Sequence, residues 1–138
     1  MKRWLLHITL SALSGFMLYA LFVTYAPIIE GKFFPVVKNT KITIVVQESL
    51  RTTIITGESY RIRDCDFRGL EIYKEGVSGG ASLVPLEILE PTKTRGLGLF
   101  TFGPWRVGLT ADEIASLGYS IAYHRCHPFY LTQSRFYP

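Results

Sequence analysis

The chain has 138 residues, of which 48% are hydrophobic and 19% are charged, and this composition excludes a solvated, disordered chain. Two of its 15 basic residues, Lys2 and Arg3, precede an apolar segment, so the chain from Glu30 onward keeps 13 basic residues against 11 acidic ones. This near-neutral balance argues against nucleic acid as a partner, and the length allows one domain.

The apolar segment runs from Trp4 to Ile29, 26 residues without an acidic, lysine or arginine side chain. As a helix rising about 1.5 Å per residue it would extend roughly 39 Å, enough to cross a hydrocarbon core of ~30 Å. We therefore predict that residues 1–29 form a cytoplasmic stub and a transmembrane anchor, and that residues 4–29 contact the lipid bilayer.

A cleaved signal peptide is the alternative to an anchor. Its apolar core is typically 7–15 residues long and ends in small residues at the cleavage site, whereas here the run is longer and Ala26 is followed by Pro27. Basic residues ahead of the span favour a cytoplasmic N-terminus, and the rest of the chain is then exported. Ser11 and Gly15 form a small-xxx-small pair that would allow two such helices to dimerise.

After the anchor, residues 30–40 read as a juxtamembrane linker and residues 41–138 as an exported β domain with an aromatic C-terminal tail. Alternating or β-branched patterns predict short strands separated by turns, which is typical of a β-sandwich or small barrel. Thr110 and Glu113 fit the capping box of one short helix that ends at Gly118. The fold class is therefore mainly β. The predicted strands are 41–47, 52–56, 60–63, 69–74, 83–89, 99–109 and 119–126.

The two cysteines, Cys65 and Cys126, both lie in the exported part, where disulfides persist. We predict a disulfide between them that closes a loop of about 61 residues and contributes roughly 4 kcal/mol in the chain-entropy model. A bridge between the two sheets of a sandwich would be similar to an immunoglobulin-like domain. However, His124 stands where the tyrosine corner of that fold has tyrosine, so the likeness is an analogy.

Metal binding and catalysis are alternative roles for the same region. His124, Cys126 and His127 are ligand types that suit zinc or copper, but they show no established spacing, and adjacent strand residues point to opposite faces. Without a catalytic motif in the sequence, we predict a non-enzymatic protein without a cofactor. A metal- or thiol-dependent envelope enzyme that uses His124 and His127 is the alternative.

Two aromatic groups are candidate binding sites, because rigid aromatic side chains and arginine are enriched in binding hot spots. The competing interpretation is that they fill the core or form a last strand at a sheet edge. The candidates are Phe100, Phe102, Trp105, Phe129, Tyr130, Arg135, Phe136 and Tyr137.

Arg63–Cys65 (RDC) and Tyr123–Pro128 (YHRCHP), behind one anchor helix, resemble small phage- or prophage-encoded single-pass membrane proteins with one exported β domain and no assigned function. The resemblance implies a bacterial inner-membrane setting with a periplasmic domain and supplies no functional residues. The resulting hypothesis is a non-enzymatic interaction protein or accessory subunit that binds a protein partner. A phage-derived exclusion or lysis accessory factor is a further alternative.

Overall fold

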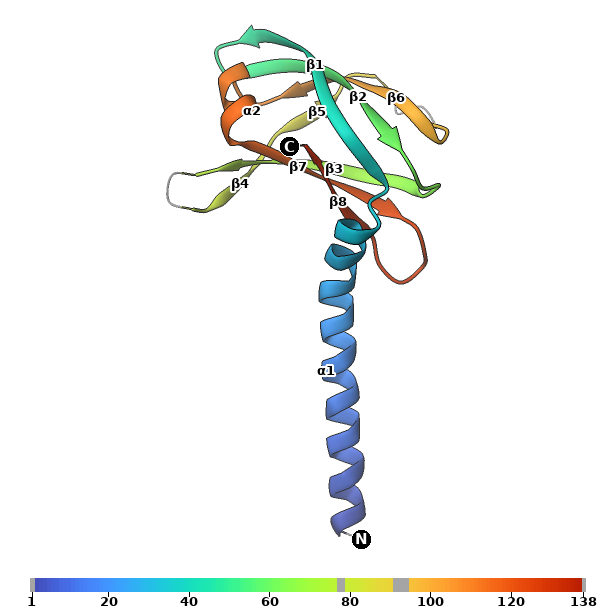
Figure 1. Cartoon of the computed structure of the whole chain (residues 1–138). Helices are drawn as coiled ribbons and strands as arrows, with labels where there is room; N and C mark the ends of the chain where they lie inside the picture. Colours follow the sequence, from blue (N-terminus) through green and yellow to red (C-terminus); the bar gives the residue numbers. More distant parts are fainter. Residues whose placement is uncertain (1, 77–78, 91–94, 138) are drawn as a thin grey trace.

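A computed structural model describes residues 2–76, 79–90 and 95–137 of the chain (Figure 1). A long helix, α1 (Lys2–Phe33), leads into a β domain that contains a second, short helix, α2 (Ala111–Leu117). The strands are β1 (Val37–Ser49), β2 (Thr52–Arg61), β3 (Asp66–Glu75), β4 (Ala81–Val84), β5 (Leu86–Ile88), β6 (Gly98–Val107), β7 (Gly118–Arg125) and β8 (Thr132–Tyr137).

The strands form two four-stranded sheets in which every neighbouring pair is antiparallel. One sheet has the order β1-β2-β6-β5 and the other β4-β3-β7-β8. The sheets face each other like the two layers of a sandwich, and α1 projects from the domain beside β8 (Figure 1). The predicted mainly β fold, with a long apolar helix ahead of it and one short helix within it, is confirmed.

The region predicted as a linker, residues 30–40, differs from that prediction. The helix continues to Phe33 and β1 begins at Val37, so residues 34–36 alone join them. The physical reason is that this end of α1 packs on the β domain, where Pro27, Gly31 and Val36 are buried. An expectation based on composition alone could not include these contacts.

Several strand boundaries also differ from the predictions, and two of these differences have a local reason. The sequence pattern separates 52–56 from 60–63, but β2 runs unbroken through Gly57, where a Cβ atom would lie 2.2 Å from the Lys41 carbonyl oxygen and 2.4 Å from the Phe102 ring. The single strand predicted over 83–89 is divided at Pro85, where the chain passes from β4 in one sheet to β5 in the other. Both are edge strands, as the proline indicates.

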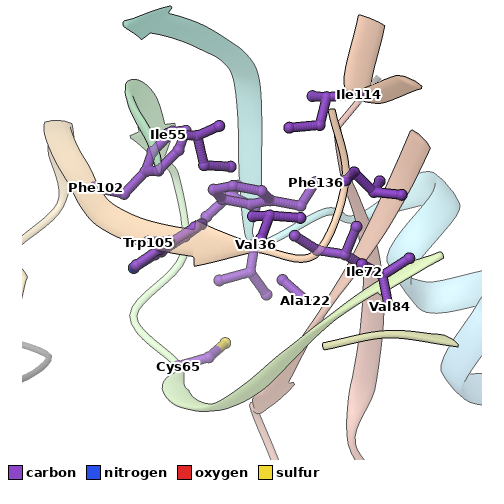
Figure 2. Close-up of a cluster of buried hydrophobic side chains, with 13 residues drawn as sticks. Val36, Ile55, Cys65, Ile72, Val84, Phe102, Trp105, Ile114, Ala122 and Phe136 are labelled. Carbon is purple, nitrogen blue, oxygen red and sulfur yellow. The ribbon is translucent and has the colours of Figure 1, made fainter. Parts of the chain in front are cut away.

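The core lies between the sheets and is aromatic at its centre. The Phe102 ring centroid lies 4.7 Å from that of Trp105 and 5.0 Å from that of Phe136, which belongs to the opposite sheet. Figure 2 shows this cluster with Ile114 of α2 and Val36, the residue ahead of β1, packed against it. The link from α1 to β1 therefore contributes to the core.

The predicted disulfide is confirmed between Cys65 and Cys126, whose Cα atoms are 4.6 Å apart. Its place differs from that of an immunoglobulin-type bridge. Cys65 precedes β3 and Cys126 follows β7, and their neighbours Asp66 and Arg125 are paired in the same sheet. The bridge therefore joins adjacent strand ends within one sheet. The expectation of a bridge between the two sheets, on which the immunoglobulin analogy depends, is wrong because strand pairing cannot be inferred from cysteine spacing.

The predicted capping box is confirmed at the start of α2. The Glu113 backbone amide donates to Thr110 Oγ1, and the Thr110 amide donates to the Glu113 carboxylate. Gly118 does not end the helix in a left-handed conformation. Its φ of −87° and ψ of 138° lead directly into β7, so the chain enters the strand without a turn.

Candidate functional site

A carboxylate at the end of α1 connects the helix to three parts of the β domain. Glu30 Oε1 lies 2.8 Å from Arg63 in the β2–β3 loop, and its Oε2 lies 3.0 Å from His127 Nε2 and 2.8 Å from the Thr132 hydroxyl of β8. Arg63 also donates to the Phe34 carbonyl at 2.7 Å. Only 14% of the Glu30 side chain is exposed, whereas its partners Arg63 and His127 are partly exposed. The charge-assisted hydrogen bonds of this carboxylate hold α1 against the sandwich.

The backbone of α1 approaches β8 at Gly31. A Cβ atom at this position would lie 1.6 Å from the Gln133 carbonyl oxygen, so only glycine permits the observed packing. Just after the helix, Val36 donates its amide to the Ser134 hydroxyl at 3.2 Å. The helix end and the chain after it therefore lie along the free edge of β8.

The β7–β8 loop contacts α1 closer to its N-terminus. The Tyr130 ring packs edge-on against Phe22 with centroids 5.7 Å apart, and His127 packs against Tyr130 at 4.0 Å. Phe129, in the same loop, is 79% exposed. Figure 1 shows this loop extending from the sandwich along α1.

The structure separates the predicted binding residues into two groups. Phe102, Trp105 and Phe136 are core residues and offer no outer surface to a protein partner. The competing interpretation, a last strand at a sheet edge, describes β8, the edge strand that carries Phe136. The others remain at least partly accessible: Phe100, Phe129, Tyr130, Arg135 and Tyr137.

The metal alternative at His124, Cys126 and His127 is wrong. The Cys126 sulfur is bonded to Cys65, His124 is buried with its ring beside Phe67, and His127 faces Glu30. Among the residues that the structure describes, no group of three or more histidine, cysteine or acidic side chains could hold a metal ion. The disulfide also removes the thiol that a thiol-dependent enzyme would need.

A cavity of about 320 Å³ lies between the sheets at the end where the disulfide is located. His124 is 4% exposed, and its Nδ1 atom is buried without a hydrogen-bond partner among the described residues. Burial, reinforced by the positive charge of Arg61, lowers the pKa of His124 to about 4. The cavity is lined by Val37, Arg61, Cys65, Asp66, Phe67, Arg68, Leu70, Arg95, Phe100, Trp105, Ala122, His124 and Phe136.

Two arginines in this cavity are bound to neighbouring protein groups. Arg61 donates to Asp64 at 2.7 Å and to the carbonyls of Cys65 and Arg95, and Arg68 lies 3.2 Å from Asp66. Arg61 therefore holds the wall of the cavity in shape, whereas the Arg68–Asp66 pair is exposed. Both ion pairs are local in the sequence, but the contact of Arg61 with the Arg95 carbonyl depends on how the loops fold back.

Arg95 differs from these two arginines. Its guanidinium lies 4.8 Å from the centre of the Phe100 ring, and burial lowers its pKa. No carboxylate within the described ranges pairs with it. The aromatic signal at Phe100 is visible in the sequence, but the pattern there does not predict a cation above the ring.

No family model matches the chain, and no curated protein or solved structure matches it either. Of the described helices, α1 is long and apolar enough over Leu6–Phe33 to cross a membrane, as either a membrane anchor or a signal sequence would be. Together with the disulfide, this indicates an extracytoplasmic β domain.

Proposed function

We propose that this protein is a single-pass membrane protein of the bacterial envelope that acts without catalysis as an interaction module or accessory subunit. Its N-terminus lies in the cytoplasm, and its disulfide-bonded β domain lies in the periplasm. The observation that carries the proposal is the packing of the end of α1 into the β domain through Gly31 and Glu30. A cleaved leader would have no use for such contacts.

Because the end of α1 packs into the β domain through Glu30 and Gly31, the position of α1 in the bilayer fixes the distance of the domain from the membrane surface. With Trp4 and Tyr25 near the two interfaces, as amphipathic rings prefer, Phe22 lies at the outer edge of the hydrocarbon core. Tyr130 contacts Phe22, and Phe129 is exposed beside it, so the β7–β8 loop reaches the membrane surface. This arrangement gives the aromatic residues of the tail a lipid partner.

The tip of the β1–β2 hairpin lies at the other end of the domain (Figure 1). Leu50 at the turn is 92% exposed, and Val45 and Val46 on β1 are also exposed. Because β1 has 13 residues, each rising about 3.3 Å, the tip stands at most roughly 40 Å from the start of the strand. We propose that this tip contacts the protein partner through Leu50, since it faces away from the bilayer.

The anchor is tested with the full chain carrying a C-terminal epitope tag in a bacterial host. We expect the uncleaved chain to stay in the membrane pellet after alkaline carbonate extraction. Protease should digest the β domain in spheroplasts and leave it intact in whole cells. A shortened chain in the soluble fraction, or protection from protease in spheroplasts, would contradict the proposal.

The contact surface is tested separately by recovering bound proteins from solubilised membranes. Leu50→Asp should reduce the recovered partner at least tenfold, whereas Leu99→Asp, at an exposed leucine on β6 away from the hairpin tip, should not. Equal recovery with both variants would exclude the hairpin tip. Circular dichroism checks that both variants are folded.

A further inference from the structure

The inter-sheet cavity has features of a ligand site, and this inference does not depend on whether α1 spans a membrane. Its volume of about 320 Å³ lies at the lower end of the range for small-molecule pockets. Much of its wall is apolar, with Leu70, Phe100, Trp105, Ala122 and Phe136 contributed by several strands. A well-packed sandwich would fill this space with side chains.

The polar groups on the wall are unequally satisfied. Arg61 and Arg68 are paired with Asp64 and Asp66, but Arg95 lacks a carboxylate partner in the described part of the chain. A half-buried guanidinium without a counter-ion carries a desolvation cost that an anion would offset. Arg61 donates to the Arg95 carbonyl and so positions this residue at the wall.

His124 adds a second unmet polar group. Its Nδ1 is buried and has no hydrogen-bond partner among the described residues, which is uncommon for an atom in a folded protein. A neutral imidazole carries one donor and one acceptor nitrogen, and His124 is among the residues that line the cavity. Arg95 therefore favours an anionic occupant, and His124 adds a neutral polar ring to the same wall.

We propose that this cavity binds a small amphipathic anion, with its carboxylate or phosphate head at Arg95 and its compact apolar body against Phe100 and Trp105. The charge comes from Arg95 and the shape from the aromatic walls. No covalent step is involved.

The test uses the full chain in nanodiscs, with empty nanodiscs as the blank. In a Trp4→Phe background, Trp105 is the sole tryptophan, and because it lines the cavity its emission should report binding. The probes are cyclohexanecarboxylate, cyclohexyl phosphate, their neutral analogue cyclohexanemethanol, and inorganic phosphate. None of them absorbs where tryptophan does.

We expect a saturable change in Trp105 emission with at least one organic anion, at least tenfold tighter than with cyclohexanemethanol or inorganic phosphate. The tighter of the two anions identifies the preferred head group. If cyclohexanemethanol binds as tightly as the organic anions, the cavity is an apolar pocket that does not recognise the charged head group. Equal binding of inorganic phosphate would remove the role of the aromatic walls, and no saturable change with any probe would overturn the proposal.

Arg95→Gln should weaken binding of the preferred anion at least tenfold, and Arg95→Lys should restore part of it, because the charge returns without the guanidinium fork. The matched control is Arg51→Gln, in the exposed β1–β2 turn outside the cavity. Unchanged affinity in Arg95→Gln would exclude Arg95 as the anchor of the head group. Thermal unfolding of each variant shows whether the fold is retained.

Discussion

Among the individual residues, Gly31 decides how the helix meets the sandwich. Its missing Cβ lets the Gln133 carbonyl approach to a distance that no other residue tolerates. The same helix contains Gly15, around which nothing lies within 4 Å. Two glycines of one helix therefore have different roles, and the sequence alone does not separate them.

Gly31→Ala should destabilise the protein by about 1–3 kcal/mol, because the added methyl group displaces the helix from β8. Gly15→Ala is the matched control and should leave stability unchanged or raise it by up to about 1 kcal/mol, because alanine favours a helix over glycine. The measurement is chemical unfolding of the full chain in detergent, followed by near-ultraviolet circular dichroism. Equal midpoints for the two variants would show that the helix end is not packed as described.

His124 makes stability depend on pH. Its pKa is about 4 in the folded protein, below the ordinary 6.5, so between these values the unfolded chain binds a proton that the folded chain does not. The free energy of unfolding should therefore fall as pH falls through this window, by about 3 kcal/mol at most. Above pH ~5 most carboxylates are still charged, so the change there comes mainly from histidine.

His124→Gln should lack this dependence between pH 6.5 and about 5, whereas His7→Gln, in the helix, should retain it. Denaturant titrations at closely spaced pH values provide the measurement. A wild-type stability that stays flat across this window would mean that His124 is not buried in its neutral form.

Among the secondary-structure elements, β3 and β7 are neighbours in one sheet whose ends the disulfide joins. The bridge adds a covalent link at the end of the sandwich where the cavity lies. The strands flanking that end are therefore fixed in register by a bond as well as by their backbone ladder.

The Cys65→Ala/Cys126→Ala variant should lose about 4 kcal/mol of stability, the loop-closure entropy of a 61-residue separation. Reductant should lower the urea midpoint of the wild-type protein to that of the double variant and leave the variant itself unaffected. Insensitivity of the wild type to reductant under unfolding conditions would show that no bridge forms.

In the molecule as a whole, the proposed anchor and the sandwich act as one unit, because Glu30, Gly31 and Val36 fix their relative placement. The β7–β8 loop is then held against α1 at the level of Phe22. If α1 spans the bilayer, Phe129 must enter its outer interface.

Phe129→Trp in the Trp4→Phe background should be quenched strongly by brominated lipids in nanodiscs. Leu50→Trp in the same background, at the far tip, should not be quenched, and the buried Trp105 serves as an unquenched reference. Quenching of Trp4 in the wild type tests the span itself. If Trp4 is quenched but the tryptophan of the Phe129→Trp variant is not, the anchor is retained and the loop contact is excluded.

Local patterns are sufficient to predict several features. The helix is predictable from its 26-residue apolar run, the mainly β fold from alternating residue patterns, and the cap from the Thr110–Glu113 spacing. The disulfide is predictable because the sequence has two cysteines and both follow the apolar run. Pro85 indicates an edge strand for the same reason, because it cannot donate to a ladder.

Tertiary packing accounts for the rest. Phe102 and Phe129 are alike in sequence terms, yet one is buried in the core and the other is among the most exposed residues. Three features depend on how the chain folds back on itself: the pair of strands whose ends the disulfide joins, the partners of Glu30, and the contact of Arg95 with Phe100. Such contacts have no local signature, so the elements follow from the sequence pattern, whereas the junction and the cavity exist only in the folded arrangement.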